Sequence, residues 1–150
     1  MKVKAANILL VEDNEDHAEL TMRALMEGKI VNEIFHVLDG QEAIDYVYQK
    51  GRYADSSRYP IPDLILLDIK LPGIDGLELL QTFKSDPAVS RIPIIMLTTS
   101  VKDEEIARGY RYGANSYIIK PIKLKDFQEK IRELKMYWLI TSELPHDAKQ

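Results

Sequence analysis

The chain has 150 residues, 45% of them apolar and 29% charged, a balance typical of a single globular domain. It carries 20 Lys and Arg against 24 Asp and Glu, and a net charge of −4 has the wrong sign for wrapping a nucleic-acid backbone. The lack of cysteine excludes a thiol nucleophile, a thiolate zinc site and a disulfide framework.

The N-terminal apolar segment does not read as a signal peptide. Residues 5–11 are mostly apolar and follow two lysines, but four acidic residues between positions 12 and 16 interrupt the pattern. No apolar run reaches the roughly 18 residues that a membrane span needs. We therefore expect a cytoplasmic protein with no membrane-inserted segment.

In chain order, five apolar runs of strand length alternate with stretches of helical length. The runs cover residues 7–11, 34–38, 64–67, 94–97 and 117–119. The first intervening stretch carries Leu20, Ala24 and Leu25 at helical spacing. The last stretch steps by three and four through Leu124, Phe127, Ile131, Leu134 and Trp138. Three pairs have the spacing of a helix-capping box: Asp39 with Glu42, Asp75 with Glu78, and Ser100 with Asp103.

This alternation predicts the fold class. Because strands that alternate with helices are joined by right-handed crossovers, the strands are expected to lie parallel, with helices on both faces of the sheet. The run Leu-Ile-Leu-Leu at residues 64–67 supports this, since a strand covered on both faces needs no polar alternation. We predict an α/β domain, a doubly wound five-stranded parallel sheet with five helices.

Polar residues follow the ends of four of the five runs. Glu12 and Asp13 follow the first, Asp68 the third, Thr98 the fourth and Lys120 the fifth. Ligands of an open parallel sheet bind outside the carboxyl ends of the strands, so these side chains are expected to converge. Two like charges about 4 Å apart repel by about 4 kcal/mol at an effective dielectric constant of about 20, so three carboxylates require cations. Lys120 supplies one, and Mg²⁺ suits the site as another because it prefers oxygen ligands.

Asp68 is the candidate nucleophile, because it ends the most apolar run and that run is expected to be the central strand. A carboxylate can attack phosphorus and form an acyl phosphate. A divalent cation, a lysine and a threonine hydroxyl can stabilise the charge that spreads over a transferring phosphoryl group. The sequence has no Gly-rich phosphate-binding loop, so the phosphoryl group must come from another molecule.

These residues resemble the receiver domains of two-component response regulators. The resemblance runs from about residue 7 to residue 136 and rests on four segments in register: ILLVEDN at 8–14, LLDIKLPGIDG at 66–76, PIIMLTT at 93–99 and GANSYIIKP at 113–121. It implies a flavodoxin-like strand order, 2-1-3-4-5. It also implies that Asp68 accepts a phosphoryl group from a histidine kinase.

The resemblance assigns further roles at the same site. Glu12, Asp13, Asp68 and the backbone carbonyl of Lys70 would hold Mg²⁺. Thr98 and Lys120 would contact the phosphoryl oxygens. Thr98 and Tyr117 would transmit the switch by a change of the tyrosine rotamer, and the bond between Lys120 and Pro121 would be cis.

The resemblance also predicts the domain organisation: an extension at 1–6, a receiver domain at 7–138 and a tail at 139–150. The tail leaves no room for a DNA-binding domain, so output is expected through protein contacts. The loop at 51–62 and residues 137–139 resemble small regulators that partner phytochrome-type histidine kinases. An apolar surplus at 136–140 favours either a homodimer through the region from the fourth to the fifth helix or a fold-back over the monomer.

Three alternatives on the same fold fit the residues less well. A flavin carrier would need a Ser-, Thr- or Gly-rich phosphate loop where Glu12 and Asp13 stand. A hydrolase with an Asp-x-Asp signature would lack its general acid, because Lys70 occupies the second Asp position. A receiver-like module that takes no phosphate is disfavoured by the full set of site residues. We expect a signalling protein, not an enzyme, with only self-phosphorylation from a donor and slow autodephosphorylation.

The three histidines are predicted to be structural. His17, His36 and His146 lie too far apart in the sequence to suggest a metal-binding motif.

Overall fold

The computed structural model describes residues 6–27, 31–99 and 103–136. Strands and helices alternate along them, as predicted. The strands are β1 (Ala6–Val11), β2 (Val31–Val37), β3 (Leu64–Asp68), β4 (Ile94–Thr98) and β5 (Ser116–Ile119). The helices are α1 (Glu15–Glu27), α2 (Gly40–Val47), α3 (Gly76–Ser85), α4 (Asp103–Arg111) and α5 (Leu124–Glu133), with a 3₁₀ turn η1 (Gly51–Tyr53) after α2.

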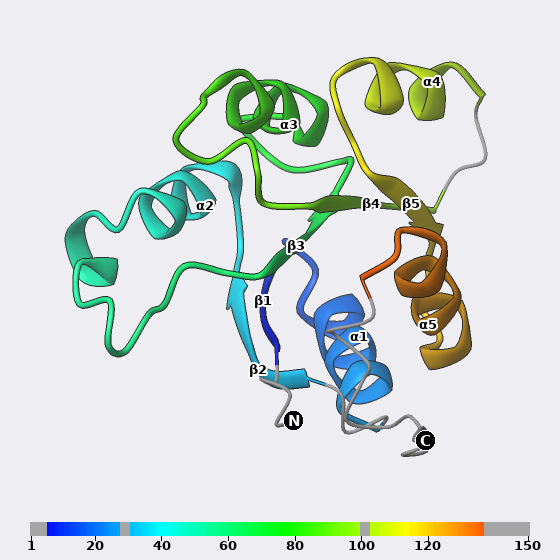
Figure 1. Cartoon of the computed structure of the whole chain (residues 1–150), viewed down its shortest axis with the longest axis horizontal. Helices are drawn as coiled ribbons and strands as arrows, with labels where there is room; N and C mark the ends of the chain where they lie inside the picture. The colour runs from blue at the N-terminus through cyan, green and yellow to red at the C-terminus, as the bar shows by residue number, and fades with distance from the viewer. Residues whose placement is uncertain (1–5, 28–30, 100–102, 137–150) are drawn as a thin grey trace.

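The five strands form one parallel sheet in the order β2-β1-β3-β4-β5, which confirms the predicted topology. Helices α1 and α5 cover one face, and α2, α3 and α4 lie on the other (Figure 1). All five residues of the central strand β3 are buried, because helices pack on both of its sides. Asp68 therefore ends the central strand, as predicted.

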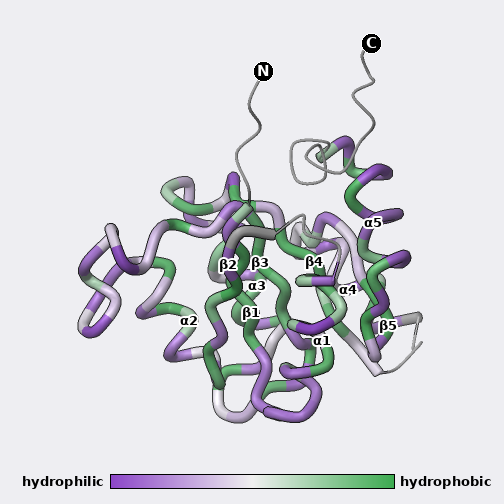
Figure 2. Tube along the Cα trace, turned by 90° about the horizontal axis from the view of Figure 1, so that it is seen from below, coloured by the Kyte–Doolittle hydropathy of each residue, from purple (hydrophilic) through white to green (hydrophobic). Residues whose placement is uncertain are grey.

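A separate hydrophobic core lies on each face of the sheet. Successive strand residues point to opposite faces, so Leu66 packs with Phe127 and Ile131 of α5, whereas Leu67 packs with Phe83 of α3. Apolar residues run along the strands at the centre of the molecule (Figure 2). The predicted stripe of α5 is confirmed at its buried positions Phe127 and Ile131, while Trp138 lies outside the described residues.

The predicted helix starts have three different outcomes. At α2, Asp39 Oδ1 accepts a hydrogen bond from the Glu42 amide at 2.8 Å, while the Glu42 carboxylate accepts from the Leu38 amide and not from the cap residue itself. At α3, Asp75 is the N-cap residue but its side chain makes no capping hydrogen bond. Ser100 lies outside the described residues.

The predicted inward position of Leu20 on α1 is wrong. The buried residues of this helix are Ala18, Thr21 and Leu25, which follow steps of three and four, and Leu20 is 51% exposed. Leu20 and Leu25 are five residues apart and cannot share one narrow stripe, so only Leu25 reaches the core.

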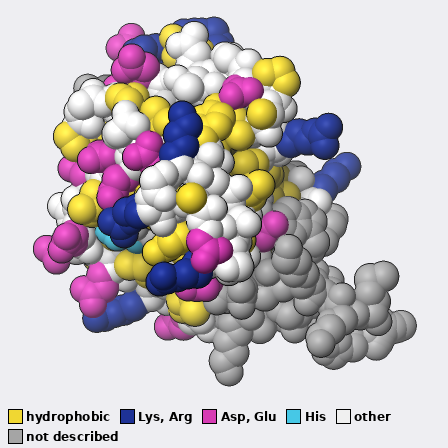
Figure 3. Space-filling model, turned by 90° about the vertical axis from the view of Figure 1, so that its left-hand side faces the viewer, with side chains coloured by type: hydrophobic (Ala, Val, Ile, Leu, Met, Phe, Trp, Pro, Cys, Tyr) yellow, Lys and Arg dark blue, Asp and Glu magenta, His cyan; other side chains and the backbone are white. Residues whose placement is uncertain are grey.

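The loop at 51–62 packs against α2 through aromatic rings. Tyr53 and Tyr59 both contact Tyr46, with ring centroids 5.0 and 6.0 Å away. The Tyr46 hydroxyl donates a hydrogen bond to the carbonyl of Pro60, which ties the loop to the domain. Acidic, basic and apolar side chains are interspersed over this side of the molecule (Figure 3).

Candidate phosphoryl-accepting site

The candidate site lies at the carboxyl edge of the sheet, where the sequence predicted it. Asp68 and Thr98 are the last residues of β3 and β4, and Lys120 follows β5 directly. The structure brings all the predicted site residues except Tyr117 to one pocket of about 200 Å³. Its lining is Glu12, Asp13, Asn14, His17, Asp68, Lys70, Thr98, Thr99 and Lys120.

The ammonium group of Lys120 is the centre of this pocket. It donates to Glu12 Oε1 at 2.7 Å and to Asp68 Oδ2 at 3.0 Å, and it contacts His17 Nδ1 at 3.1 Å. An ammonium has three N–H donors and no acceptor, so these partners account for all three. The backbone amide of Lys120 also donates to the carbonyl of Thr98 at 2.7 Å, which holds the end of β5 against β4.

The second oxygen of Asp68 has its own partner. The backbone amide of Lys70 donates to Asp68 Oδ1 at 3.2 Å, across the turn that follows β3. The side chain of Lys70 leaves the pocket toward α4, where its ammonium lies 4.0 Å from Glu105 Oε2. The Asp68 carboxylate is thus oriented from both sides, by a cation and by a backbone amide.

A glycine brings α3 against the backbone of Asp68. A Cβ atom at Gly76 would collide with the carbonyl oxygens of Asp68 and Ile69. The Gly76 amide also donates to the carbonyl of Ile69 at 3.0 Å. The start of α3 and the end of β3 therefore form one closely packed unit.

Burial and neighbouring charges perturb two of the site groups. Burial raises the pKa of Asp68 to about 6, and the nearby Glu12 carboxylate adds to this effect, while Lys120 opposes it. Burial alone would lower the pKa of Lys120, but its hydrogen bonds to Glu12 and Asp68 outweigh burial and raise it. Lys120 therefore stays charged while Asp68 is held in an environment that does not compensate its charge fully.

Three carboxylates in the pocket can hold a divalent cation. Oxygen atoms of Glu12, Asp13 and Asp68 all lie within 4.8 Å of one another, and Asp13 is exposed to solvent while the other two are buried. Carboxylate oxygens are ligands of hard cations such as Mg²⁺, Mn²⁺ and Ca²⁺. The donor set fits such an ion. The ion would also reduce the repulsion among the three carboxylates that Lys120 alone does not compensate.

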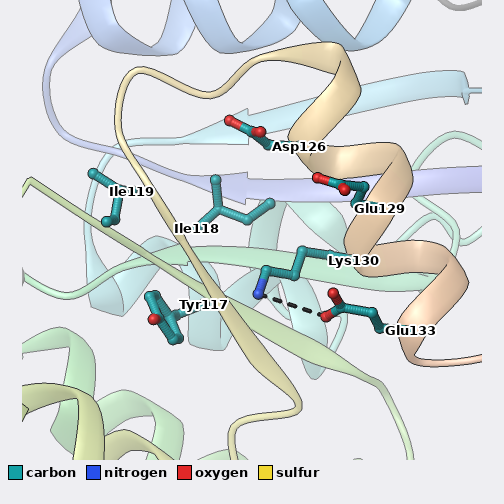
Figure 4. A pocket seen from close by; sticks show the side chains of 7 residues that line it. All are labelled: Tyr117, Ile118, Ile119, Asp126, Glu129, Lys130 and Glu133. Atoms are coloured by element: carbon teal, nitrogen blue, oxygen red, sulfur yellow. Dashed lines mark ion pairs between the residues drawn. The ribbon is translucent and has the colours of Figure 1, made fainter.

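Tyr117 lies outside this pocket, in β5, where it faces a surface groove beside α5. Its ring centroid is 6.0 Å from that of Tyr110 in a T-shaped contact, and the ammonium of Lys130 lies 5.1 Å from its centroid. It lines a groove of about 280 Å³ with acidic residues of α5 (Figure 4).

Thr98 is buried at the site. The Lys120–Pro121 peptide bond is cis, as the resemblance implied.

Two histidines touch the site, which the sequence reasoning missed. His17 contacts Lys120, and His36 Nε2 donates to the backbone carbonyl of Glu12 at 2.7 Å from the neighbouring strand β2. The sequence offered one usable signal for His36, because its strand was predicted to lie beside β1. For His17, the signal was its place three residues after Asn14, which caps α1.

The fold and this site define a class: domains that receive a phosphoryl group in two-component signalling. The chain belongs to the response regulator receiver domain family, whose family model matches residues 8–132. Phosphorylation on an aspartate is typical of this family.

Two curated relatives match over most of their length. The probable methanogenesis regulatory protein FilR2 of Methanothrix harundinacea is 38% identical over 94% of this chain and 88% of its own length. The response regulator Rcp1 of Synechocystis sp. is 37% identical over 92% of both chains.

Solved structures agree with the fold. The bacteriophytochrome response regulator AtBRR is similar with a TM-score of 0.80, at 39% identity over 90% of this chain and 96% of that one. The phosphorylated cyanobacterial phytochrome response regulator RcpA has a TM-score of 0.76, at 39% identity over 95% of this chain and 99% of its own. The Mn²⁺-bound form of Rcp1 has a TM-score of 0.72, at 36% identity over 93% and 99%.

Within the described residues, the helices are too short or too polar to cross a bilayer.

Proposed function

We propose that the chain is a phosphoryl-accepting switch whose acceptor is Asp68 and whose donor is a phosphohistidine of a histidine kinase. The observation that carries the proposal is the Lys120 ammonium, 3.0 Å from Asp68 Oδ2 and 2.7 Å from Glu12. We place the receiver domain at residues 7–138. The protein would be cytoplasmic, where the ATP that supplies such kinases is found.

In the transfer, one carboxylate oxygen of Asp68 forms a bond to phosphorus. The bond between phosphorus and the donor imidazole nitrogen breaks, and its electron pair stays with that nitrogen. Lys120 keeps its positive charge beside the new phosphoryl oxygens, and the Thr98 hydroxyl can donate a hydrogen bond to one of them. We expect the chain to phosphorylate itself from small acyl phosphates and to lose the phosphate slowly by hydrolysis.

Mg²⁺ is the metal that we propose, held by Glu12, Asp13, Asp68 and the backbone carbonyl of Lys70. When bound, it neutralises charge on the phosphoryl oxygens. The all-oxygen donor set supports this choice, as does the similarity to Rcp1, which has been solved with Mn²⁺. The residues of this chain orient the Asp68 carboxylate, since the Lys70 amide donates to one of its oxygens and the Lys120 ammonium to the other.

Mass spectrometry tests this proposal directly. Full-length protein is incubated with a small acyl phosphate, with Mg²⁺ or with a chelator, and the labelled residue is located. We expect label on Asp68 only with Mg²⁺, no label in Asp68→Asn, and normal label in the matched control Asp55→Asn, because Asp55 lies in the loop remote from the pocket. Equal labelling of Asp68→Asn would refute the assignment.

For the switch, we propose that phosphorylation draws Thr98 toward the phosphate and that Tyr117 turns inward from the groove. A shift from 1:99 to 99:1 needs about 5.5 kcal/mol of differential contact, and one neutral hydrogen bond contributes about 1 kcal/mol. Lys120 and the metal must therefore contribute most of it.

Output would use protein contacts, not DNA, and a homodimer is one such contact. Ile119 lines the groove of Figure 4 and is 42% exposed, and Tyr110, whose ring contacts Tyr117, is 45% exposed. These exposed apolar side chains support an interface on α4, β5 and α5. The proposed contribution of residues 137–140 lies outside the described residues. Sedimentation of the full chain against a truncation after Lys135 tests it, and a monomer at high concentration with and without a phosphoryl mimic would exclude the dimer.

The kinase partner is proposed to be of the phytochrome type. The support is the similarity to two response regulators whose names state that connection, AtBRR and RcpA.

A further inference from the structure

His17 occupies a position at the site that no step of the proposed transfer uses. It lies in the first turn of α1, partly buried, and its Nδ1 atom is 3.1 Å from the Lys120 ammonium. The other two partners of that ammonium are carboxylates. Because an ammonium only donates, Nδ1 must accept, and this requires its lone pair.

A ring of hydrogen bonds holds the imidazole in place. The Asn14 amide donates to Glu12 Oε2 at 3.1 Å, and Asn14 Oδ1 accepts from the His17 amide at 2.9 Å. His17 Nδ1 then contacts Lys120, which returns to Glu12 through its other carboxylate oxygen. The helix cap therefore fixes His17 relative to the same carboxylate that binds Lys120.

The imidazole also forms a wall. A second, smaller cavity of about 50 Å³ lies between α1 and the segment after β5, and His17, Thr99 and Lys120 line both this cavity and the site pocket. Without the ring, the two hollows would join beside Lys120.

We infer that His17 is a positioning residue for phosphoryl transfer: its Nδ1 lone pair holds one N–H of Lys120, so that the ammonium stays aimed at Asp68. A neutral acceptor suits this role, because a carboxylate in its place would add a further negative charge where an anionic donor must approach. The inference rests on the proposed function, since it concerns the rate at which Asp68 is phosphorylated.

The test uses two substitutions that differ in the acceptor. His17→Phe keeps a flat ring as the wall but removes the lone pair, whereas His17→Asn is smaller but carries an amide oxygen at the place of Nδ1. With saturating small acyl phosphate and saturating Mg²⁺, we expect His17→Phe to lower the phosphorylation rate constant about 3- to 10-fold, the effect of losing one charge-assisted hydrogen bond that water partly replaces. We expect His17→Asn to stay within about 2-fold of the unmodified chain by the same reasoning.

Two controls separate positioning from other roles. In a Lys120→Met background, where the partner is gone, His17→Phe should have no further effect on the rate. The melting temperatures of both His17 variants and their half-saturating Mg²⁺ concentrations should match those of the unmodified chain.

Several outcomes overturn the inference: a His17→Asn rate as low as that of His17→Phe, a normal rate in His17→Phe, a full effect in the Lys120→Met background, or an effect confined to Mg²⁺ affinity. Each of these leaves Asp68 labelled in the unmodified chain. Failure of the proposed function is different, because the unmodified chain would then carry no label on Asp68.

Discussion

Replacing Asp68 by Asn should stabilise the metal-free protein at neutral pH, although it removes the proposed phosphoryl acceptor. Burial and the neighbouring Glu12 raise the pKa of Asp68 from its ordinary value of 3.8 to about 6. The folded chain therefore binds this proton more tightly than the unfolded chain does. Its ionised form at pH 7.5 costs about 3 kcal/mol of folding free energy, at 1.36 kcal/mol for each pKa unit. Asn is neutral at every pH and avoids this cost, while Lys120 keeps its bond to Glu12.

The stability difference between the two chains should depend on pH. Below pH 3.8 the carboxyl is protonated in both states and the cost is absent. As pH rises toward about 6 the unfolded chain releases the proton first, so the stability of the unmodified chain falls. The advantage of Asp68→Asn should therefore be about 3 kcal/mol at pH 7.5 and about half of that at pH 5.

Urea unfolding in the presence of a chelator measures this difference. Asp86→Asn is a control with the opposite expected effect. The hydrogen bond from Tyr48 lowers the pKa of Asp86, so the ionised carboxylate stabilises the folded chain. Replacing this carboxylate by a neutral amide should therefore reduce stability at pH 7.5. Adding Mg²⁺ should stabilise the unmodified chain more than Asp68→Asn. An Asp68→Asn chain that is no more stable at pH 7.5, or an advantage that does not shrink as pH falls, would refute the reasoning.

Three further outcomes are expected. In the metal-free protein, the Asp68 carboxyl carbon should titrate by NMR with a midpoint near 6, and Glu12→Gln should lower that midpoint because the adjacent negative charge is gone; an unchanged midpoint would contradict the assigned cause. Thr98→Ala should still be labelled on Asp68 but lose the phosphorylation-induced change in the NMR environment of Tyr117, and retention of the full change would exclude this route. Phe127→Ala should cost about 3 to 5 kcal/mol in urea unfolding, because Phe127 is fully buried between α5 and the sheet, with Lys125→Ala on the same helix as a near-neutral control.

The parallel sheet and most of the site could be predicted, because the alternation of strands and helices indicates the sheet and the strand ends indicate the site. Apolar runs bounded by helical stretches predict parallel strands, and the residues after each run then have to meet at one edge. The prediction of Glu12, Asp68, Thr98 and Lys120 in one pocket is confirmed in this way. The order of the strands itself came from the family resemblance.

What could not be predicted depends on side-chain direction. His17 and Leu20 are both on α1, where the spacing of Leu20, Ala24 and Leu25 predicted one inward-facing stripe. The helix is rotated so that Ala18, Thr21 and Leu25 face the sheet, which exposes Leu20 and leaves His17 beside Lys120. Helical periodicity alone does not set that rotation when the apolar residues allow two stripes. The side-chain cap at Asp75 failed for a related reason, because capping depends on a rotamer as well as on spacing.

The contact of Gly76 with the backbone of Asp68 limits how this gene can change. Every single-nucleotide missense change in a glycine codon introduces a side chain with a Cβ atom. At position 76 any such atom collides with the main chain of Asp68 and Ile69, and no choice of rotamer avoids it because Cβ itself makes the collision. Relatives that keep the phosphoryl-accepting function should therefore retain glycine at this position, even where the neighbouring surface residues of α3 differ.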